Sequence, residues 1–491
     1  MSLQDAAIAA NRFGLGARPG DLKAIAGDPR GWLKAQLTPE TTLPAPLAAL
    51  PSTRDDAGAF QQWIRQSGLT GSISAYAKSP AMGMSEGGGM PGAAPGSPAS
   101  QPGFSVEKSF VEFFGPRYAQ ALAARFQVAT TTERPYFERL VHFWGNHFTV
   151  SSAKPIAQAL PPSFERDVAR RHAMDHFESM LIASCTHPGM LVYLDQYISI
   201  GRHSLVGMRP DLVPKGLREL LKGLNENLAR EILELHTLGV RSGYTQDDVI
   251  ALANILTGFT VAQDGKGGGE TGLFRFSPYA HEPGPQTLLG QKFPQAGVDQ
   301  GGEALTMLAR RPETAHFIAT KLVRHFIADD PPPAAVDTIA KVFQVSFGDL
   351  KSVCTALVDL PQAWDPTPRK MKPPEDYLVS AVRAMGGPAL NGGQLAALLG
   401  RMGQRPYYAP GPNGWPDVEG EWMGPDPVWK RLEWASTVSK YLATASGDPA
   451  ALGETVLGPG LTEVTRKSIR QAESPAQGLA ILLVSPEFQR R

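Results

Sequence analysis

The sequence has little cysteine, no excess of either charge and no long apolar run. Its 491 residues include two cysteines, Cys185 and Cys354, and neither stands in a C-x-x-C or Cys/His zinc spacing. A thiolate-rich metal site is therefore excluded, and a disulfide framework is not expected. Basic and acidic residues both number 47, so the chain offers no basic excess for holding nucleic-acid phosphates.

Export signals and familiar catalytic motifs are also missing. The first ten residues, MSLQDAAIAA, lack a basic stretch, and no segment reaches the roughly 18 apolar residues of a spanning helix. We therefore expect a cytoplasmic protein with no membrane partner, unless another protein carries it across. Without G-x-x-x-x-G-K-[ST], a strand-linked G-x-G-x-x-G or G-x-S-x-G, nucleotide hydrolysis, hydride transfer and serine-hydrolase chemistry are all disfavoured.

What remains reads as a mainly α protein, a multi-helix globular bundle with a small β-hairpin insertion. Periodic apolar positions predict helices over residues 4–10, 19–37, 53–67, 105–128, 135–144, 163–183, 302–308, 313–327, 334–347 and 350–357. Residues 272–276 are expected to pair with residues 287–290 as the hairpin.

One segment divides the chain. Residues 79–104 are nearly all Gly, Pro, Ala, Ser and Met. Such a composition cannot offset the entropy of ordering by burial, so a long mobile loop is expected, with a lid over a site as the alternative. This divides the chain into an N-terminal helical segment, 1–78, the loop, and a helical core domain, 105–491, that packs with the first segment.

The densest group of polar side chains lies in residues 225–239. Leu228, Ile232 and Leu235 give this predicted helix an apolar face. Glu226, Arg230 and Glu234 are spaced by four, so they line one side as a carboxylate–guanidinium–carboxylate row, with Glu231 on the neighbouring row. Two interpretations stay open, an ion-pair row packed against another helix and a ligand or metal site.

Two histidines near residue 145 form a second cluster. His142 and His147 are five residues apart, about 140° around a helix, so they cannot share a metal as an H-E-x-x-H pair does. Gly145 and Asn146 are expected to end the helix. His147 would then lie beyond the helix, free to turn toward a site, while His142 would be a core residue.

Two further segments combine rigid turns with functional side chains. His281 and Glu282 stand at a Pro/Gly turn, either facing a cleft or facing water. Residues 409–416 are followed closely by more tryptophan, so that Trp415, Trp422 and Trp429 could clamp a flat ligand or staple the loop to the core. Stapling is favoured, because tryptophan buries a large area wherever an irregular segment must be held.

Several stretches together resemble the bacterial domain-of-unknown-function 1800 family over nearly the whole chain. They are residues 11–16, 143–148, 187–190, 193–195, 225–240, 244–249, 256–259, 321–322, 326, 403–404, 414–415 and 485–488. The family more often has Ala at Gly189, Asp and Lys at Glu282 and Gln286, and Phe at His236. The last difference weakens His236 as a general catalytic group.

The resemblance implies a mostly helical single unit and a partner that is similar to alkaline phosphatases and sulfatases. Our first hypothesis is a metal-assisted, hydrolase-like enzyme for an anionic substrate. Its candidate metal ligands are His147, Glu231 and His281, around a divalent ion such as Zn²⁺ or Fe²⁺, and its candidate catalytic residues are Glu226, Arg230, Glu234 and Glu282. Arg230 would bind the substrate anion, and Glu234 or Glu282 would be the general base. The alternative is a non-enzymatic scaffold or chaperone for the phosphatase- or sulfatase-like partner.

Overall fold

Helices form most of the structure, which confirms the mainly α prediction. The computed structural model describes residues 2–66, 106–212, 223–240, 242–262, 272–387 and 390–491, and the expected loop over residues 79–104 lies outside these ranges. Within them, the strands form two small antiparallel sheets. No helix in the described ranges is both long and apolar enough to span a bilayer.

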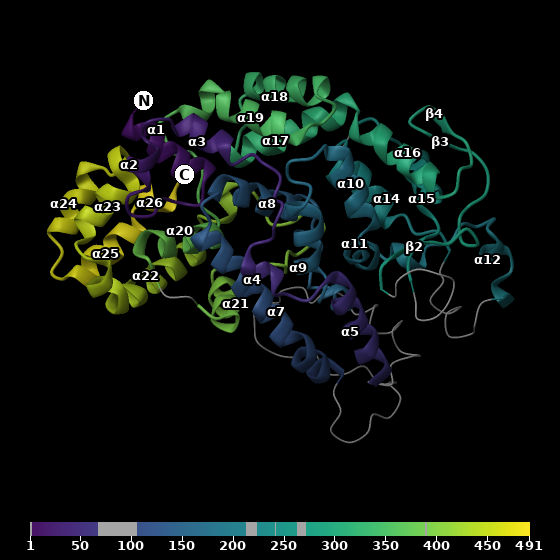
Figure 1. The fold of residues 1–491 in the computed structure, drawn as a ribbon, viewed down its shortest axis with the longest axis horizontal. Helices are drawn as coiled ribbons and strands as arrows, with labels where there is room; N and C mark the ends of the chain where they lie inside the picture. Colours follow the sequence, from purple (N-terminus) through teal and green to yellow (C-terminus); the bar gives the residue numbers. More distant parts are fainter. Residues whose placement is uncertain (1, 67–105, 213–222, 241, 263–271, 388–389) are drawn as a thin grey trace.

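The first half of the chain runs from α1, beside the C-terminal helices, through the lower part of the molecule to α12 at the opposite end (Figure 1). Its helices are α1 (Leu3–Ile8), α2 (Asp21–Ile25), α3 (Pro29–Ala35), α4 (Ala45–Ala48), α5 (Thr53–Gln66), α7 (Val106–Thr131), α8 (Pro135–His147), α9 (Pro161–Phe164), α10 (Phe177–Thr186), α11 (Pro188–Tyr193) and α12 (Leu205–Met208). The helix expected over residues 163–183 is therefore wrong as one element. After α9, the π-helical turn η4 (Glu165–Arg170) ends, and the chain turns before α10 begins.

The second half continues with helices of similar length. They are α14 (Asn227–Glu231), α15 (Gln246–Leu256), α16 (Val298–Ala309), α17 (Pro312–Phe326), α18 (Pro333–Val345), α19 (Leu350–Asp359), α20 (Pro374–Met385), α21 (Gly392–Arg401), α22 (Pro425–Ser446), α23 (Pro449–Leu457), α24 (Glu463–Arg470), α25 (Pro475–Val484) and α26 (Pro486–Gln489). The polar central helix is short, because α14 passes into the π-helical turn η7 (Ile232–His236). Thr245 and Asp248 form a capping box that opens α15.

The strand pairing differs from the predicted hairpin. β2 (Phe274–Phe276) pairs with β1 (Phe259–Val261), while β3 (Gln286–Leu288) pairs with β4 (Gln291–Phe293). Leu289 and Gly290 join β3 to β4 with φ values of 50° and 78°. Two consecutive positive φ values are those of a tight hairpin turn, in which Gly290 is a typical residue and Leu289 an unusual one. Its backbone N–H donates to Asp248 at 2.6 Å, which fixes the turn.

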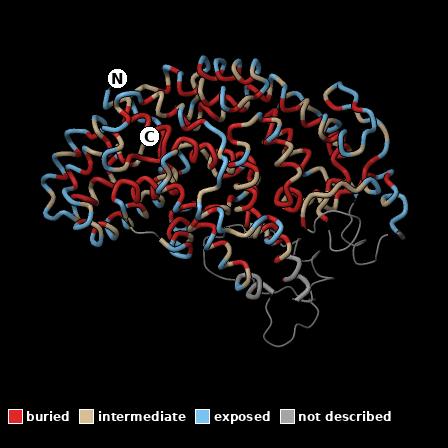
Figure 2. Tube along the Cα trace, in the orientation of Figure 1, coloured by how far each residue is buried: buried red, intermediate tan, exposed pale blue. Residues whose placement is uncertain are grey.

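One contiguous group of buried apolar side chains runs from Ala6 to Phe488 and includes all but a few of the core residues. Figure 2 shows buried residues along the whole length of the molecule. The N-terminal helices α1 and α2 lie beside the C-terminal helices at one end, and α12 and the strands lie at the other end (Figure 1). Helix α8 lies between these ends, and most of its residues are buried.

Candidate functional site

A polar cavity of about 330 Å³ lies at the end of α8. It is lined by the last turns of α8 and the residues that follow it, the last turns of α17, the beginning of α20 and residues 404–418. Arg125 of α7 and Glu165 of η4 complete the lining. Ligand sites in proteins commonly begin at about 300 Å³, so this cavity is large enough for a small molecule. Its lining includes many titratable side chains, among them Arg139, Lys321 and Asp417.

Helix α8 carries His142, Asn146 and His147 to the cavity. Pro135 occupies its first turn, and Tyr136, Leu140 and Trp144 on its apolar side are fully buried. The expectation that Gly145 and Asn146 end this helix is wrong, because the helix continues through His147. Gly145 serves close packing instead, since a Cβ there would lie 3.0 Å from the Glu165 carboxylate.

His147 is held on both ring nitrogens. Its Nε2 lies 3.2 Å from the carbonyl oxygen of His236, and its Nδ1 lies 2.9 Å from Lys321 Nζ. The carbonyl requires a donor at Nε2, so Nδ1 is the acceptor of a proton from Lys321. Burial holds the pKa of His147 well below its usual range, and Lys321 and His236 lower it further. The imidazole is therefore neutral at pH 7, with one lone pair directed at Lys321.

Lys321 is a partly buried lysine on α17 without a carboxylate partner. Burial lowers the pKa of Lys321 to about 8; Asp417 opposes this change and Arg324 adds to it. Arg324 lies one turn further along α17, lines the same cavity and donates from Nε to the Asp329 carbonyl oxygen at 3.2 Å. In the described part of the chain, no ion pair joins Lys321 or Arg324 to a carboxylate.

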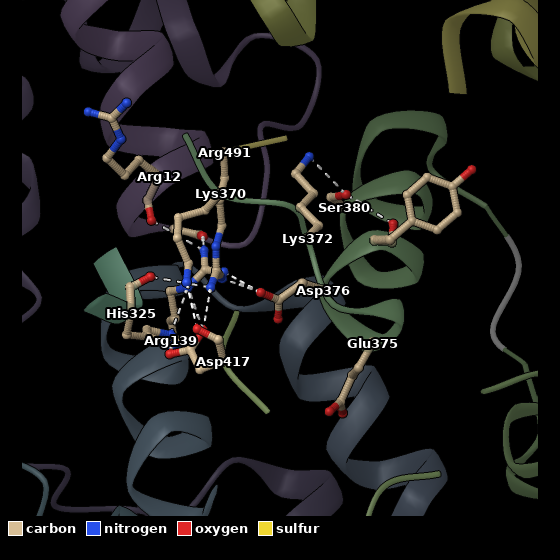
Figure 3. A network of polar contacts seen from close by, with 12 residues as sticks. Arg12, Arg139, His325, Lys370, Lys372, Glu375, Asp376, Ser380, Asp417 and Arg491 are labelled. Carbon is tan, nitrogen blue, oxygen red and sulfur yellow. Dashed lines mark hydrogen bonds and ion pairs between the residues drawn. The ribbon is translucent and has the colours of Figure 1, made fainter. Parts of the chain in front are cut away.

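The carboxylates that line the cavity are, by contrast, all engaged with cations. Arg125 contacts both Glu165 and Glu375, the latter at 2.7 Å. Figure 3 shows Asp376 and Asp417 facing Arg139, Lys370 and Arg491, and His325 Nδ1 lies 2.7 Å from Asp417. Burial of a charge is tolerated only with such pairing. Among the described residues that line the cavity, Lys321 and Arg324 are therefore cations without an ion-pair partner, whereas every carboxylate has one.

The pairing keeps Asp417 ionised. Burial by itself would raise the pKa of this carboxyl, but His325 and Lys370 outweigh the burial and hold it well below its ordinary range. The Asp417 charge thus stays committed to its own cations and weakens only in part the positive character that Lys321 and Arg324 give to the cavity.

The segment with three tryptophans closes one side of the cavity. Asn146 fixes it, because its Nδ2 donates to the Trp415 carbonyl at 2.9 Å and its Oδ1 accepts from the Trp415 N–H at 2.7 Å. Gly414 has φ 77°, and a Cβ there would lie 2.5 Å from the Asn146 carbonyl oxygen, so only glycine fits.

The three tryptophans have three different environments. Trp422 donates to the Pro416 carbonyl at 3.1 Å and is buried, as expected of a staple. Trp429 is 60% exposed. Trp415 lines the cavity, and its indole Nε1 is buried with no hydrogen-bond partner among the described residues. Stapling therefore describes Trp422, whereas Trp415 is part of the cavity lining.

The candidate metal ligands are not brought together. His147 faces Lys321, whereas His281 Nδ1 lies 2.9 Å from the Thr257 carbonyl at the end of α15. Glu231 is partly buried, and burial with the nearby Glu234 raises its pKa to about 6. Across the described ranges, no group of three or more His, Cys, Asp or Glu side chains could hold a metal ion. The structure thus gives the proposed set no common centre.

The candidate catalytic row on the central helix lies outside the cavity. Arg230 contacts Glu226 at 3.1 Å and Glu234 at 3.5 Å, and Gln246 hydrogen-bonds both Arg230 and Glu226. All three charged side chains are about one third exposed. This arrangement is the ion-pair row of the first interpretation.

Glu282 is also engaged elsewhere. It is buried, and its carboxylate accepts from the His203 backbone N–H at 2.9 Å and contacts His203 Nδ1 at 2.5 Å. This carboxylate anchors the turn before α12 to the segment that follows β2. It does not line the cavity.

The cavity residues that the sequence analysis missed are Lys321, Arg324 and Arg139. They are far apart in the sequence and become neighbours only in the fold. A signal was present, however: residues 143–148, 321–322 and 414–415 all belong to the stretches on which the family resemblance depends, and all three contribute to the cavity lining.

Together, the fold and the site define a mainly helical protein built around a basic cavity. The chain belongs to the family described as "Protein of unknown function (DUF1800)", whose model matches residues 8–490. No curated protein and no solved structure matches the chain.

Proposed function

We propose that this protein is a hydrolase-like enzyme that binds an anionic small molecule in the cavity, with His147 as its proton-transfer group. The observation that carries this proposal is the contact between Lys321 and His147, a cation without a carboxylate partner joined to a neutral imidazole at 2.9 Å. A lysine so placed attracts an anion, and a neutral imidazole beside it accepts or returns a proton.

The chemistry follows from the charge distribution. Lys321 and Arg324 would stabilise the negative charge of the substrate and any charge that develops during reaction. His147 Nδ1 would accept a proton from a substrate group or a water molecule, while the His236 carbonyl holds Nε2–H and stabilises the resulting imidazolium. As in the hypothesis from the sequence, the substrate is an anion. The residue proposed to bind it is now Lys321 instead of Arg230.

Calorimetric titration with inorganic phosphate, sulfate and acetate tests the proposal. Lys321→Met should weaken binding of the best of these anions at least about tenfold, because a hydrogen bond to a charged group contributes roughly 1.5–3 kcal/mol. Lys341→Met, on the exposed side of α18, is the matched control and should bind like the unmodified protein. Equal affinity of both variants, or no binding of any of the three anions, would contradict the proposal.

The scaffold hypothesis predicts a different outcome for the same variants. A scaffold or chaperone for a phosphatase- or sulfatase-like partner needs its surface and not its cavity. Under that hypothesis Lys321→Met would leave partner binding unchanged in a pull-down with the purified partner and would remove no activity. Loss of anion binding with intact folding, measured by circular dichroism, instead favours the enzyme.

A further inference from the structure

We propose that Lys321 is a nucleophile that forms an imine with an anionic carbonyl compound, such as a 2-oxo acid, bound in the cavity. This inference rests on the proposed function, because the same cavity must first bind the anion. It adds a covalent step and names the class of substrate as a carbonyl compound that carries a carboxylate.

The surroundings of Lys321 distinguish it from the other lysines of this region. Lys370 contacts Asp329 at 2.5 Å and Asp417 at 3.3 Å, so its ammonium is fixed by two carboxylates. Lys372 donates to Ser380 and to the Phe488 carbonyl and does not line the cavity. Of these three lysines, Lys321 is the one that lines the cavity. Its neighbour is the acceptor nitrogen of His147, which can take up a proton when the imine forms.

The environment also increases the fraction of Lys321 that is a neutral amine, compared with an exposed lysine. With its pKa near 8, about a tenth of Lys321 is neutral at pH 7, far more than for an ordinary exposed lysine. The geometry agrees with this: Arg324 stands one turn away on the same helix, and the Phe317 ring centre lies 5.6 Å from Nζ. A neighbouring cation and an apolar flank are two ways in which proteins activate lysine as a nucleophile.

The proposed step balances as an ordinary condensation. The lone pair of neutral Nζ attacks the carbonyl carbon, and the C=O bonding pair moves to oxygen. His147 Nδ1 accepts a proton from nitrogen and delivers it to that oxygen, which gives a neutral carbinolamine. A second proton transfer through His147 removes the remaining N–H proton and places it on the departing hydroxyl. The products are the imine and one water molecule, with no oxidant or reductant.

The rest of the cavity suits the carboxylate of such a compound. Arg324 has guanidinium donors available beyond its single backbone contact, and the buried Trp415 Nε1 lacks a partner among the described residues. Both line the same cavity as Lys321. A ligand that is anionic at one end and electrophilic at the neighbouring carbon would use a cation and a nucleophile that stand on one helix.

Reductive trapping tests the imine directly. The protein is incubated with pyruvate and sodium cyanoborohydride at pH 7, and peptides are mapped by mass spectrometry. We expect one reduced adduct per chain at Lys321 and little at Lys341, an exposed lysine that serves as the internal control. Lys321→Arg, which keeps the charge, should abolish this adduct. His147→Phe should slow its formation by about a hundredfold, the usual contribution of a positioned acid–base group.

A parallel titration with pyruvate, without reductant, separates the two proposals. Binding of pyruvate without an adduct at Lys321 would overturn the imine and leave the proposed function standing. Failure of pyruvate, phosphate, sulfate and acetate alike to bind would overturn both. An adduct that forms equally at Lys321 and Lys341 would also contradict the imine, because it would show ordinary surface reactivity. Circular dichroism confirms that each variant is folded.

Discussion

Arg230 on the central helix and Lys321 on α17 are both helical cations, yet they differ in what surrounds them. Arg230 lies between Glu226 and Glu234, is 39% exposed and also hydrogen-bonds Gln246. Lys321 lines a cavity, contacts a neutral imidazole and has no ion-pair partner in the described ranges. The first cation is neutralised where it stands, whereas the second remains available to a ligand.

The difference teaches that the density of charge along a sequence is a poor guide to a site. A row of Glu, Arg and Glu at spacings of four satisfies itself within one helix. A functional cation is one whose partners are missing, and the absence of partners is visible only after the fold has brought distant segments together. The following variants test this contrast between self-paired and unpaired charge.

The largest effect is expected at a buried ion pair on α8, the helix that carries His147. Glu138 on α8 is 2% exposed and contacts Arg170, which is 3% exposed. Glu138→Gln removes the buried carboxylate that Arg170 contacts and leaves this guanidinium with Glu40, at 3.3 Å, as its charge partner. Breaking a buried pair is costly, so the free energy of unfolding should fall by up to about 3–5 kcal/mol. The matched variant Glu226→Gln, in the partly exposed row, should lower it by less than about 1 kcal/mol. Urea unfolding monitored by circular dichroism gives both values.

The pH dependence of stability sharpens that prediction. Burial would raise the pKa of Glu138, but Arg170 and His142 outweigh it and lower this pKa to about 2. Since the folded-state pKa lies below the ordinary value, the contribution of Glu138 is complete above pH 5 and is lost as the pH falls toward 2. Stability should therefore decrease over this range, and the decrease should be smaller in Glu138→Gln. An identical pH profile for both proteins would refute the assignment.

A smaller effect is expected at Asn146, which fixes the loop that closes the cavity. Asn146→Ala removes two hydrogen bonds to the Trp415 backbone, so we expect the free energy of unfolding to fall by roughly 1–3 kcal/mol. Anion affinity should fall with it, because Trp415 lines the cavity. Asn254→Ala on α15, away from this loop, serves as the control for amide loss. If stability falls but anion affinity does not change, the loop that Asn146 holds does not contribute to anion binding.

The smallest effect is expected at Arg230. Arg230→Met should change the free energy of unfolding by less than about 1 kcal/mol, because exposed ion pairs contribute little. It should leave the affinity for phosphate or sulfate unchanged. Calorimetric titration of this variant beside Lys321→Met compares the two cations directly. A loss of anion binding in Arg230→Met would contradict this prediction and would show that the anion binds at the central helix.

The sequence predicted the helices well where local signals are strong. The apolar spacing over residues 313–327 predicted α17, and the capping residues Thr245 and Asp248 are a local signal for α15, since caps and periodicity depend on neighbours in the chain. It failed where a contact from elsewhere decides. Gly145 lies within a helix where Glu165 packs closely against it, and the tight turn at Leu289 is held by a hydrogen bond from its backbone to Asp248.

The site shows the same limit. His147 could be chosen from its neighbourhood in the chain, but its partner Lys321 lies 174 residues away. Apart from the family resemblance of residues 321–322, nothing in the surrounding sequence pointed to Lys321. His281 and Glu231 looked equally suitable as ligands, yet Thr257 and the central helix hold them elsewhere. Only the pairing of the remaining carboxylates reveals which cations the cavity leaves unpaired, and that pairing depends on the complete fold.

The most direct test of the central claim is the pH dependence of anion affinity, measured by calorimetric titration with the best-binding anion between pH 6.5 and 9.5. Because the pKa of Lys321 is about 8, the lysine is charged below that pH and loses its charge above it. Affinity should therefore be high near pH 7 and fall progressively as the pH rises past 8, while Lys321→Arg should keep its affinity throughout. An affinity that stays constant across this range in the unmodified protein would show that Lys321 is not the cation that binds the ligand.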